Sequence, residues 1–224
     1  MQKFLVAVVP VRKGSVRVKN KNFKKFFNEN LLYYKIKTLK KVSFIDEIII
    51  NTDSEKAIEI AKSHNVNYHL RNDYYASSEC SNSNFWKHVA QETNSQYIMF
   101  TNCTSPLIKK KTYNNLIKFF KKNLKKHDSF NTVTEMKEYF YYKRKPLNFI
   151  PSKTPNSQEL PELIKLNFAI NIISRDLMIK NKSLVGSNPF FYKLDEIEGY
   201  DINHPHEFDY AEYLFNSKYL RKNK

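Results

Sequence analysis

The sequence is poor in the residues that mark several classes of protein. It has two cysteines, Cys80 and Cys103, which are too few for a disulfide scaffold or a cysteine-built zinc site. No apolar run approaches the roughly 18 residues that a membrane helix needs. Pro10 and Arg12 follow the first apolar run too soon for a signal peptide. These absences predict a protein that works in the reducing cytoplasm, without a membrane partner.

Arginine is also scarce. Only six of the 38 basic residues are arginine, although 22 acidic residues leave a formal net charge of +16. Such a basic chain suggests a nucleic-acid partner, but base readers and bidentate phosphate clamps favour the planar arginine side chain over lysine. We therefore expect no specific nucleic-acid partner, and a solvated lysine coat that attracts small anions. The alternative is a non-catalytic module that binds polyanions through Lys121, Lys122, Lys125 and Lys126.

Hydrophobic residues make up 41% of the 224 residues, which is enough to bury one sizeable core. Apolar runs typical of buried strands alternate with segments of helical periodicity. The predicted strands are 4–9, 47–51, 66–70, 97–101, 130–134, 167–173 and 190–194, and the predicted helices are 31–39, 55–63, 85–91, 112–124, 176–180 and 205–216. This order predicts an α/β fold with a Rossmann-like, doubly wound, mostly parallel sheet.

The pattern breaks at about 138–166, a 29-residue stretch with four prolines and several aromatic residues. A long irregular stretch inside a compact domain is usually functional. We expect a single domain over 1–224 in which this excursion is a lid or a dimerisation arm. The aromatic side chains would then be buried against a second copy, so we expect a homodimer.

Three polar segments, 10–22, 52–54 and 102–106, follow predicted strands. Ligands of open parallel sheets bind beyond the carboxyl ends of the strands. The first segment combines Gly14 with several cations, and its exposed amides would suit a polyphosphate. A turn with solvated lysines explains its composition equally well. The segment is not a Walker loop, because the Gly-Lys-Ser/Thr ending is missing.

The order of residues in this segment is more informative than its composition. VVPVRKGSVRVKNKNF resembles the N-terminal signature of the acylneuraminate cytidylyltransferase family, Pro-Ala-Arg-x-Gly-Ser-Lys-x-x-x-x-Lys-Asn. The family's lysine after the serine is Val16 here. The residues in register are Pro10, Arg12, Gly14, Ser15, Lys21 and Asn22. Further segments resemble the family in the same order along the chain: IIINTDSEKAIEIAKSHNV, LRNDYYASSECS, TNCTSPLI, SQELPELIKLNFAINII and EGYDINHPHEFDYAE.

The resemblance implies a fold of the nucleotide-diphospho-sugar transferase type and a CTP-dependent enzyme. A hydroxyl of an acidic, sialic-acid-like (nonulosonic) sugar would attack the α-phosphorus of CTP, giving a CMP-sugar and pyrophosphate. Mg²⁺ would be the cofactor, held by Asp201 and Asn203, since oxygen ligands suit that ion. Arg12, Lys21 and Asp201 would be the catalytic residues.

The resemblance also implies the residues that bind the two substrates. Those for CTP are Arg12, Ser15, Lys21, Asn22, Arg71, Ser81 and Asn102. Those for the acceptor sugar are Asn102, Gln158, Lys165 and Asn167.

This chain departs from the family mainly on the acceptor side. Lys165 stands where the family has an arginine, so the point charge of an ammonium replaces the bidentate fork of a guanidinium. Ser157 and Ile108 also replace arginines, and Phe168 replaces a glycine. These departures therefore bear on the identity of the acceptor sugar and leave the expectation of CTP as the nucleotide unchanged. 3-Deoxy-manno-octulosonic acid or a phosphonate is the alternative acceptor.

Asn203 replaces the second aspartate of the family's Asp-x-Asp pair. The metal site then loses one negative charge, although an amide oxygen is still a ligand for Mg²⁺. An inactive transferase is a second alternative. Other polar residues have simpler interpretations: His204 and His206 fit a helix N-terminal turn, His88 fits core packing, and Asp53 fits a cap after the strand at 47–51 as well as it fits catalysis.

Overall fold

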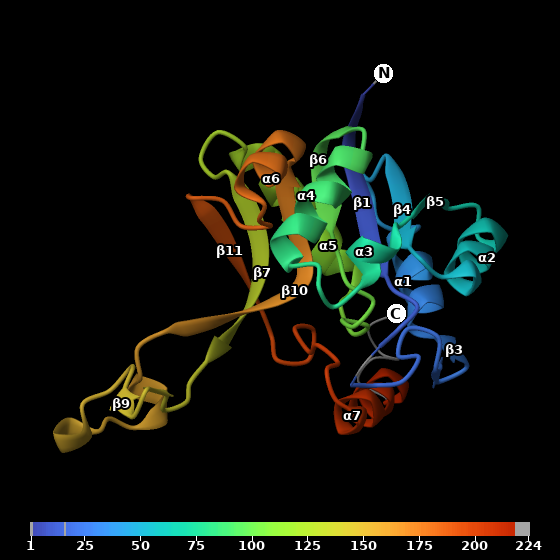
Figure 1. The fold of residues 1–224 in the computed structure, drawn as a ribbon. Helices are drawn as coiled ribbons and strands as arrows, with labels where there is room; N and C mark the ends of the chain where they lie inside the picture. Colours follow the sequence, from blue (N-terminus) through green and yellow to red (C-terminus); the bar gives the residue numbers. More distant parts are fainter. Residues whose placement is uncertain (1, 16, 218–224) are drawn as a thin grey trace.

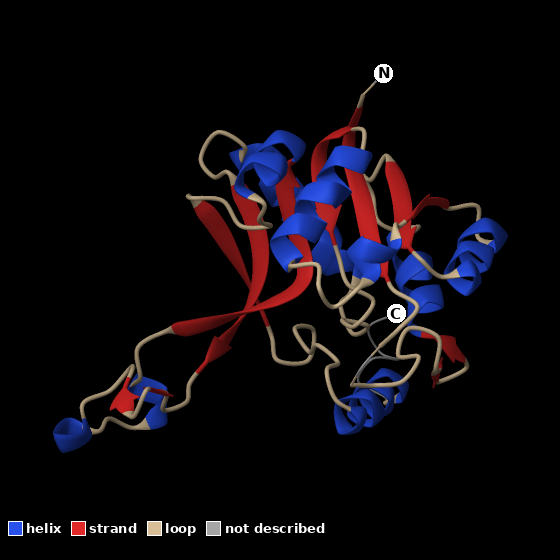
Figure 2. Ribbon diagram, viewed as in Figure 1, coloured by secondary structure: helices blue, strands red, loops and turns tan. Residues whose placement is uncertain are grey.

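The computed structural model of the protein describes residues 2–15 and 17–217. In those residues seven strands form one sheet in the order β11-β7-β10-β6-β1-β4-β5 (Figures 1 and 2). The strands are β1 (Lys3–Val11), β4 (Glu47–Thr52), β5 (Asn67–Leu70), β6 (Ser95–Phe100), β7 (Ser129–Met136), β10 (Leu163–Ser174) and β11 (Pro189–Leu194). Neighbouring strands are parallel except for β10, which runs antiparallel to both β6 and β7. The expected mostly parallel sheet is confirmed.

Helices cover both faces of this sheet. They are α1 (Leu31–Leu39), α2 (Glu55–Ser63), α3 (Asp73–Ala76), α4 (Asn82–Glu92), α5 (Lys110–Asn123), α6 (Arg175–Asn181) and α7 (Pro205–Asn216). Two apolar clusters result, one beneath α1, α2, α5 and α7 and the other beneath α4 and α6. None of the helices in the described ranges has the length and apolar character of a membrane span.

The central strand β1 explains why both faces are covered. Its side chains alternate between the two clusters, with Leu5, Ala7 and Val9 in one and Val6 and Val8 in the other. Each of these residues is fully buried. A continuous apolar run is therefore what a doubly covered strand requires. The position of β1 between β6 and β4 also places its carboxyl end, and the polar loop after it, within the carboxyl edge of the sheet.

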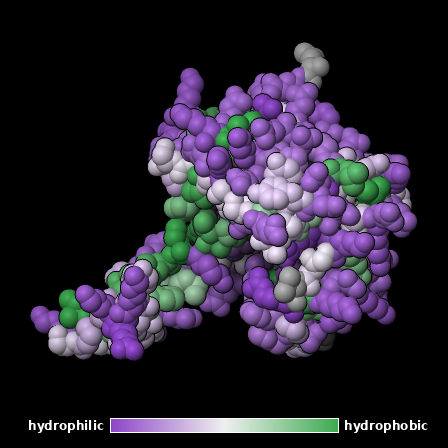
Figure 3. All heavy atoms as spheres, viewed as in Figure 1, coloured by the Kyte–Doolittle hydropathy of each residue, from purple (hydrophilic) through white to green (hydrophobic). Residues whose placement is uncertain are grey.

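The excursion at 138–166 is an arm that projects from the sheet (Figure 1). It carries the strands β8 (Tyr141–Tyr142) and β9 (Lys145–Pro146), followed by the 3-10 turns η1 (Pro151–Lys153) and η2 (Ser157–Glu159). Its stem is β7 paired with the first residues of β10, so this strand begins at Leu163, four residues before the predicted start. Figure 3 shows apolar side chains along the arm and at its junction with the sheet.

A bulge separates the arm-bearing part of β10 from the part inside the sheet. The register with β7 shifts between Leu166 and Asn171, and Phe168 adopts a φ of 54°. A bulky residue in this left-handed region is strained. Its ring packs 6.3 Å from that of Trp86 on α4. Phe168 thus occupies a backbone conformation that glycine, the residue in the family signature, adopts at low cost.

Candidate active site

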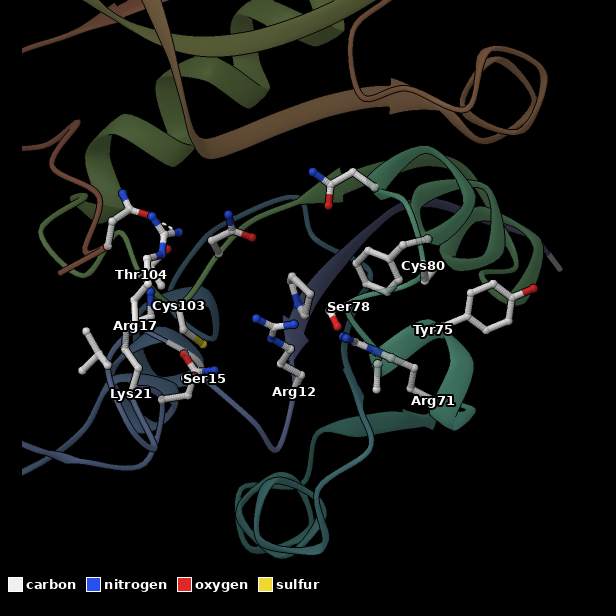
Figure 4. Close-up of a pocket in the computed structure, with 18 of the residues that line it drawn as sticks. Arg12, Ser15, Arg17, Lys21, Arg71, Tyr75, Ser78, Cys80, Cys103 and Thr104 are labelled. Carbon is white, nitrogen blue, oxygen red and sulfur yellow. Dashed lines mark hydrogen bonds between the residues drawn. The ribbon is translucent and has the colours of Figure 1, made fainter.

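A cavity of about 450 Å³ lies at the carboxyl edge of the sheet (Figure 4). Four segments line it: the loop after β1, the segment from Arg71 to Phe85, the turn after β6 and the residues just before α7. Four of the five charged residues that line it are cationic, namely Arg12, Arg17, Lys21 and Arg71. In Figure 4, Arg12 lies between a group around Lys21 and Arg17 and a group around Arg71 and Ser78.

The loop after β1 is held from two sides. The Lys13 amide donates a hydrogen bond to Asp53 Oδ1 at 2.7 Å, so the strand-end carboxylate after β4 fixes the first loop. The Lys21 Nζ atom donates to the carbonyl oxygen of Ile202 at 2.5 Å. Asp53 does not line the cavity. Its alternative role as a local anchor therefore fits better than catalysis.

Asp201 and Asn203 line the cavity beside Lys21, although these residues are far apart in the sequence. The Asn203 Nδ2 atom donates to Asp201 Oδ2 at 2.9 Å, and Arg17 Nη2 donates to Asn203 Oδ1 at 2.9 Å. The amide oxygen that would ligate a metal is therefore engaged by Arg17. The Asp201 Oδ1 atom is buried and has no hydrogen-bond partner of normal geometry among the described residues.

Burial pushes both members of the Lys21–Asp201 pair toward their neutral forms. Burial raises the pKa of Asp201, and the Thr104 and Asn203 side chains and the Lys21 ammonium act in the opposite direction. Burial also lowers the pKa of Lys21, while Asp201 raises it and Arg17 lowers it. An anionic ligand over Lys21 and a cation on Asp201 would each favour the charged forms.

These residues fit a magnesium site that the nucleotide helps to form. An orphaned, buried carboxylate oxygen is a suitable hard ligand, and Mg²⁺ in nucleotide enzymes commonly binds one or two carboxylates together with substrate phosphates. Among the described residues no group of three or more His, Cys, Asp or Glu could hold a metal. Asp201 is the residue that would hold the ion, whereas Asn203, predicted as the second ligand, donates its Nδ2–H to the Asp201 carboxylate and has its oxygen engaged by Arg17.

Arg71 is fixed at the other end of the cavity. Its side chain is 5% exposed, and it donates from Nε to Asn51 Oδ1 at 2.8 Å and from Nη2 to the Asn51 carbonyl at 2.7 Å. Its guanidinium also stacks over the Phe85 ring at 4.3 Å. Burial lowers the pKa of Arg71 to about 10, with Asp53 acting in the opposite direction, so the side chain stays cationic at neutral pH.

Eight of the nine residues predicted for CTP or metal binding line the cavity: Arg12, Ser15, Lys21, Asn22, Arg71, Asn102, Asp201 and Asn203. Ser81 does not; it is the N-cap of α4 and accepts from the Asn84 amide at 3.2 Å. Its neighbours Cys80 and Asn82 do line the cavity.

The three other predicted acceptor residues lie outside this cavity. Gln158 is exposed in η2 on the arm, and Lys165 is exposed on the stem of β10. Asn167 is 1% exposed, and its side chain bonds Thr132 and Thr134 of the neighbouring strand β7. Asn167 therefore helps to hold the arm-bearing strand, and Gln158 and Lys165 lie on the arm and its stem, away from this cavity.

Several cavity residues were not predicted from the sequence. Position 16, where the family has a lysine, lies outside the described residues, whereas Arg17 contributes a cation one residue later. Tyr75 also lines the cavity and stacks on His88 at 3.7 Å between ring centroids. His88 is half-buried behind that ring rather than in the core, because α3 brings Tyr75 over it. His204 caps α7 as expected, in a capping box with Glu207.

Comparisons with known proteins agree with this geometry. A family model described as cytidylyltransferase matches residues 6–224. A CMP-N,N'-diacetyllegionaminic acid synthase of Campylobacter jejuni is 25% identical over 96% of this chain and 97% of its own length. A post-translational flagellin modification protein B of Campylobacter coli is 23% identical over 97% of each chain. The fold is shared with a CMP:2-keto-3-deoxy-manno-octonic acid synthetase complexed with CTP, at a TM-score of 0.73, 12% identity and coverage of 99% of this chain and 100% of that one.

Proposed function

The chain belongs to the cytidylyltransferase family, and we propose that its cavity joins CTP to an acidic sugar of the nonulosonic type. The products are a CMP-sugar and pyrophosphate. The observation that carries the proposal is the convergence of Arg12, Arg17, Lys21 and Asp201 on one cavity at the carboxyl edge of the sheet. That edge is where nucleotides bind in this class of fold.

The cations provide the electrostatic part of catalysis. Arg12, Arg17 and Lys21 bind the triphosphate and stabilise the negative charge that grows on the leaving pyrophosphate. A hydroxyl of the sugar forms a new bond to the α-phosphorus as the bond to the β-phosphate oxygen breaks, and the hydroxyl proton is released. Positioning the hydroxyl in line with the leaving group supplies the rest of the rate. Mg²⁺ held by Asp201 would neutralise charge on the phosphates.

Arg71 and the segment after it hold the cytidine part of CTP. The guanidinium is rigid, since Asn51 binds two of its nitrogens and Phe85 supports its face. Ser77 and Ser78 line the cavity next to it and offer hydroxyl and backbone groups to the base. Asn102, from the turn after β6, also lines the cavity and would contact both CTP and the acceptor sugar.

An acidic acceptor is supported by the sugar acid in the name of the Campylobacter jejuni relative. It is also supported by the cationic character of the chain around the cavity. Gln158 and Lys165 lie on the arm and its stem, away from the cavity of their own chain. They would therefore bind the acceptor in the cavity of a partner subunit. Exposed arm residues such as Tyr141 and Ile150, 61% and 64% accessible, would be buried in that homodimer. The two free cysteines agree with a cytoplasmic setting.

Pyrophosphate release tests the function directly. Purified protein with CTP and Mg²⁺ is incubated with a panel of nonulosonic acids, 3-deoxy-manno-octulosonic acid and a phosphonate. We expect release with at least one nonulosonic acid, and none with ATP, GTP or UTP. Turnover only with one of the other acceptors would correct the acceptor class. Failure with every acceptor, together with no calorimetric binding of CTP, would overturn the proposal.

A further inference from the structure

A buried lysine lies behind the nucleotide cavity without a carboxylate to balance it. Lys35, on α1, is 3% exposed. None of the ion pairs formed within residues 2–15 and 17–217 includes Lys35. A buried ammonium is costly when no opposite charge is close. The sequence gives this residue no role, since it belongs to none of the motifs.

All three protons of the ammonium have neutral acceptors. The Nζ atom lies 2.8 Å from Tyr113 Oη, 3.1 Å from the Ser105 carbonyl oxygen and 3.4 Å from Thr101 Oγ1. The Thr101 hydroxyl donates to the Ala169 carbonyl at 2.6 Å, so Tyr113 donates its proton to Thr101 at 2.8 Å. Each oxygen near Lys35 is then free to accept, and the site is built for the charged, three-donor form of lysine.

The contacts of Lys35 enclose the turn between β6 and α5. Thr101 begins this turn and Ser105 ends it, and both bind the ammonium. Between them lie Asn102, Cys103 and Thr104, which line the cavity. Through Thr101, the same network reaches Ala169 on the arm-bearing strand β10. Lys35 thus fixes the stretch of the cavity wall formed by Asn102, Cys103 and Thr104.

The positive charge is also close to the cavity itself. Cys103 is 1% exposed and lines the cavity. Burial raises the pKa of its thiol to about 12, while the charges of Lys35 and Lys21 both act in the opposite direction. The charges of Lys35 and Lys21 therefore both act on the Cys103 thiol, although Lys35, unlike Lys21, does not line the cavity.

We propose that Lys35 is a positioning residue whose buried ammonium holds the turn at Thr101–Ser105 and supplies a positive charge that the phosphates of the bound nucleotide balance. The proposal rests on the nucleotide-binding function of the cavity. In the free protein this charge is a cost to stability, and in the complex it contributes to affinity. Lys35 does not touch the substrate.

The test compares Lys35→Met with Lys37→Met, which removes the same charge from an exposed position on the same helix. Calorimetry measures binding of CTP and of CMP, and thermal unfolding measures the stability of the free protein. We expect Lys35→Met to weaken CTP binding by at least about tenfold, since one unit charge about 10 Å away acts with that strength at an effective dielectric constant of about 20. CMP, with fewer charges, should lose less affinity than CTP. The melting temperature should change little, because the cost of the buried charge and the three hydrogen bonds of the ammonium disappear together.

The outcomes separate this inference from the function it rests on. Absence of CTP binding by the unsubstituted protein would count against the proposed function. Normal CTP binding by Lys35→Met, or equal losses for CTP and CMP with a lower melting temperature, would overturn the role of Lys35 and leave the function intact. Lys37→Met should match the unsubstituted protein within about twofold, because exposed charges are screened.

Discussion

Individual charged residues in the cavity are held in a partly desolvated state. Burial lowers the pKa of Lys21 and raises that of Asp201. Lys21 is also anchored, because its ammonium binds the Ile202 carbonyl beside that carboxylate. Such a cation is pre-oriented for a phosphate and needs little reorganisation when charge develops there.

Lys21→Met should therefore lower kcat/KM for CTP by about 10²–10³, the usual effect of removing one preorganised group that stabilises a transition-state anion. The lost hydrogen bond to Ile202 should reduce the free energy of unfolding by only about 1 kcal/mol. Steady-state kinetics and urea unfolding measure the two effects. The control is Lys19→Met, an exposed position in the same loop. Activity of Lys21→Met within threefold of the control would contradict this role.

At the scale of elements, one carboxylate fixes the edge of the sheet. Asp128 precedes β7, and its Oδ2 atom accepts from the Ser187 amide at 2.8 Å and the Asn188 amide at 2.9 Å. These amides lie just before β11, which pairs with β7 from Pro189 onward. A Cβ on Gly186 would lie 2.2 Å from the carboxylate, so the turn can pass this close only with glycine.

The stability that Asp128 provides should depend on pH. Burial would raise its pKa, but hydrogen bonds from Asn188, Ser187 and Ser129 lower it below the usual value. Its contribution is thus present above the pKa of the unfolded chain and is lost as the pH falls through the folded pKa. Asp128→Asn should destabilise the protein at neutral pH but not in strong acid, as measured by urea unfolding at several pH values. An equal destabilisation at every pH would contradict this account.

The elements also show what the sequence can and cannot predict. The strands and helices of the sheet follow from apolar periodicity, because their side chains face two covered surfaces. The start of β10 at Leu163 was missed because it depends on pairing with β7 rather than on a local pattern. The loop after β1 and Asp201 were found as motifs. Arg17 was assigned no role, since only the folded loop brings it to Asn203.

At the scale of the whole molecule, the arm leaves apolar surface uncovered. Tyr141, Tyr142, Leu147 and Ile150 are each at least 60% exposed on it. The excursion expected at 138–166 already contained Gln158 and Lys165, but the sequence did not show that the arm carries them away from the cavity of their own chain. Their placement depends on the path of the chain beyond the sheet, which no local pattern encodes.

Tyr141→Ser combined with Ile150→Ser should weaken the proposed dimer. Each side chain should contribute about 1.5–3 kcal/mol when buried, so the pair should raise the dimer Kd by at least about a hundredfold. Sedimentation velocity over a range of concentrations measures it. Tyr213→Ser, which removes an aromatic side chain that is 69% exposed on α7, is the matched control. Unchanged association of the arm variant, or a monomeric unsubstituted protein, would contradict a dimer built by the arm.

The central claim is that the loop after β1 and the residues before α7 together hold CTP with Mg²⁺. Calorimetric titration of CTP with and without Mg²⁺ tests it most directly, using the unsubstituted protein, Asp201→Ala and the control Asp209→Ala, whose carboxylate is exposed. We expect Mg²⁺ to strengthen CTP binding to the unsubstituted protein and the control. Asp201→Ala should bind CTP without this gain. A full gain from Mg²⁺ in Asp201→Ala, or no CTP binding by the unsubstituted protein, would contradict the claim.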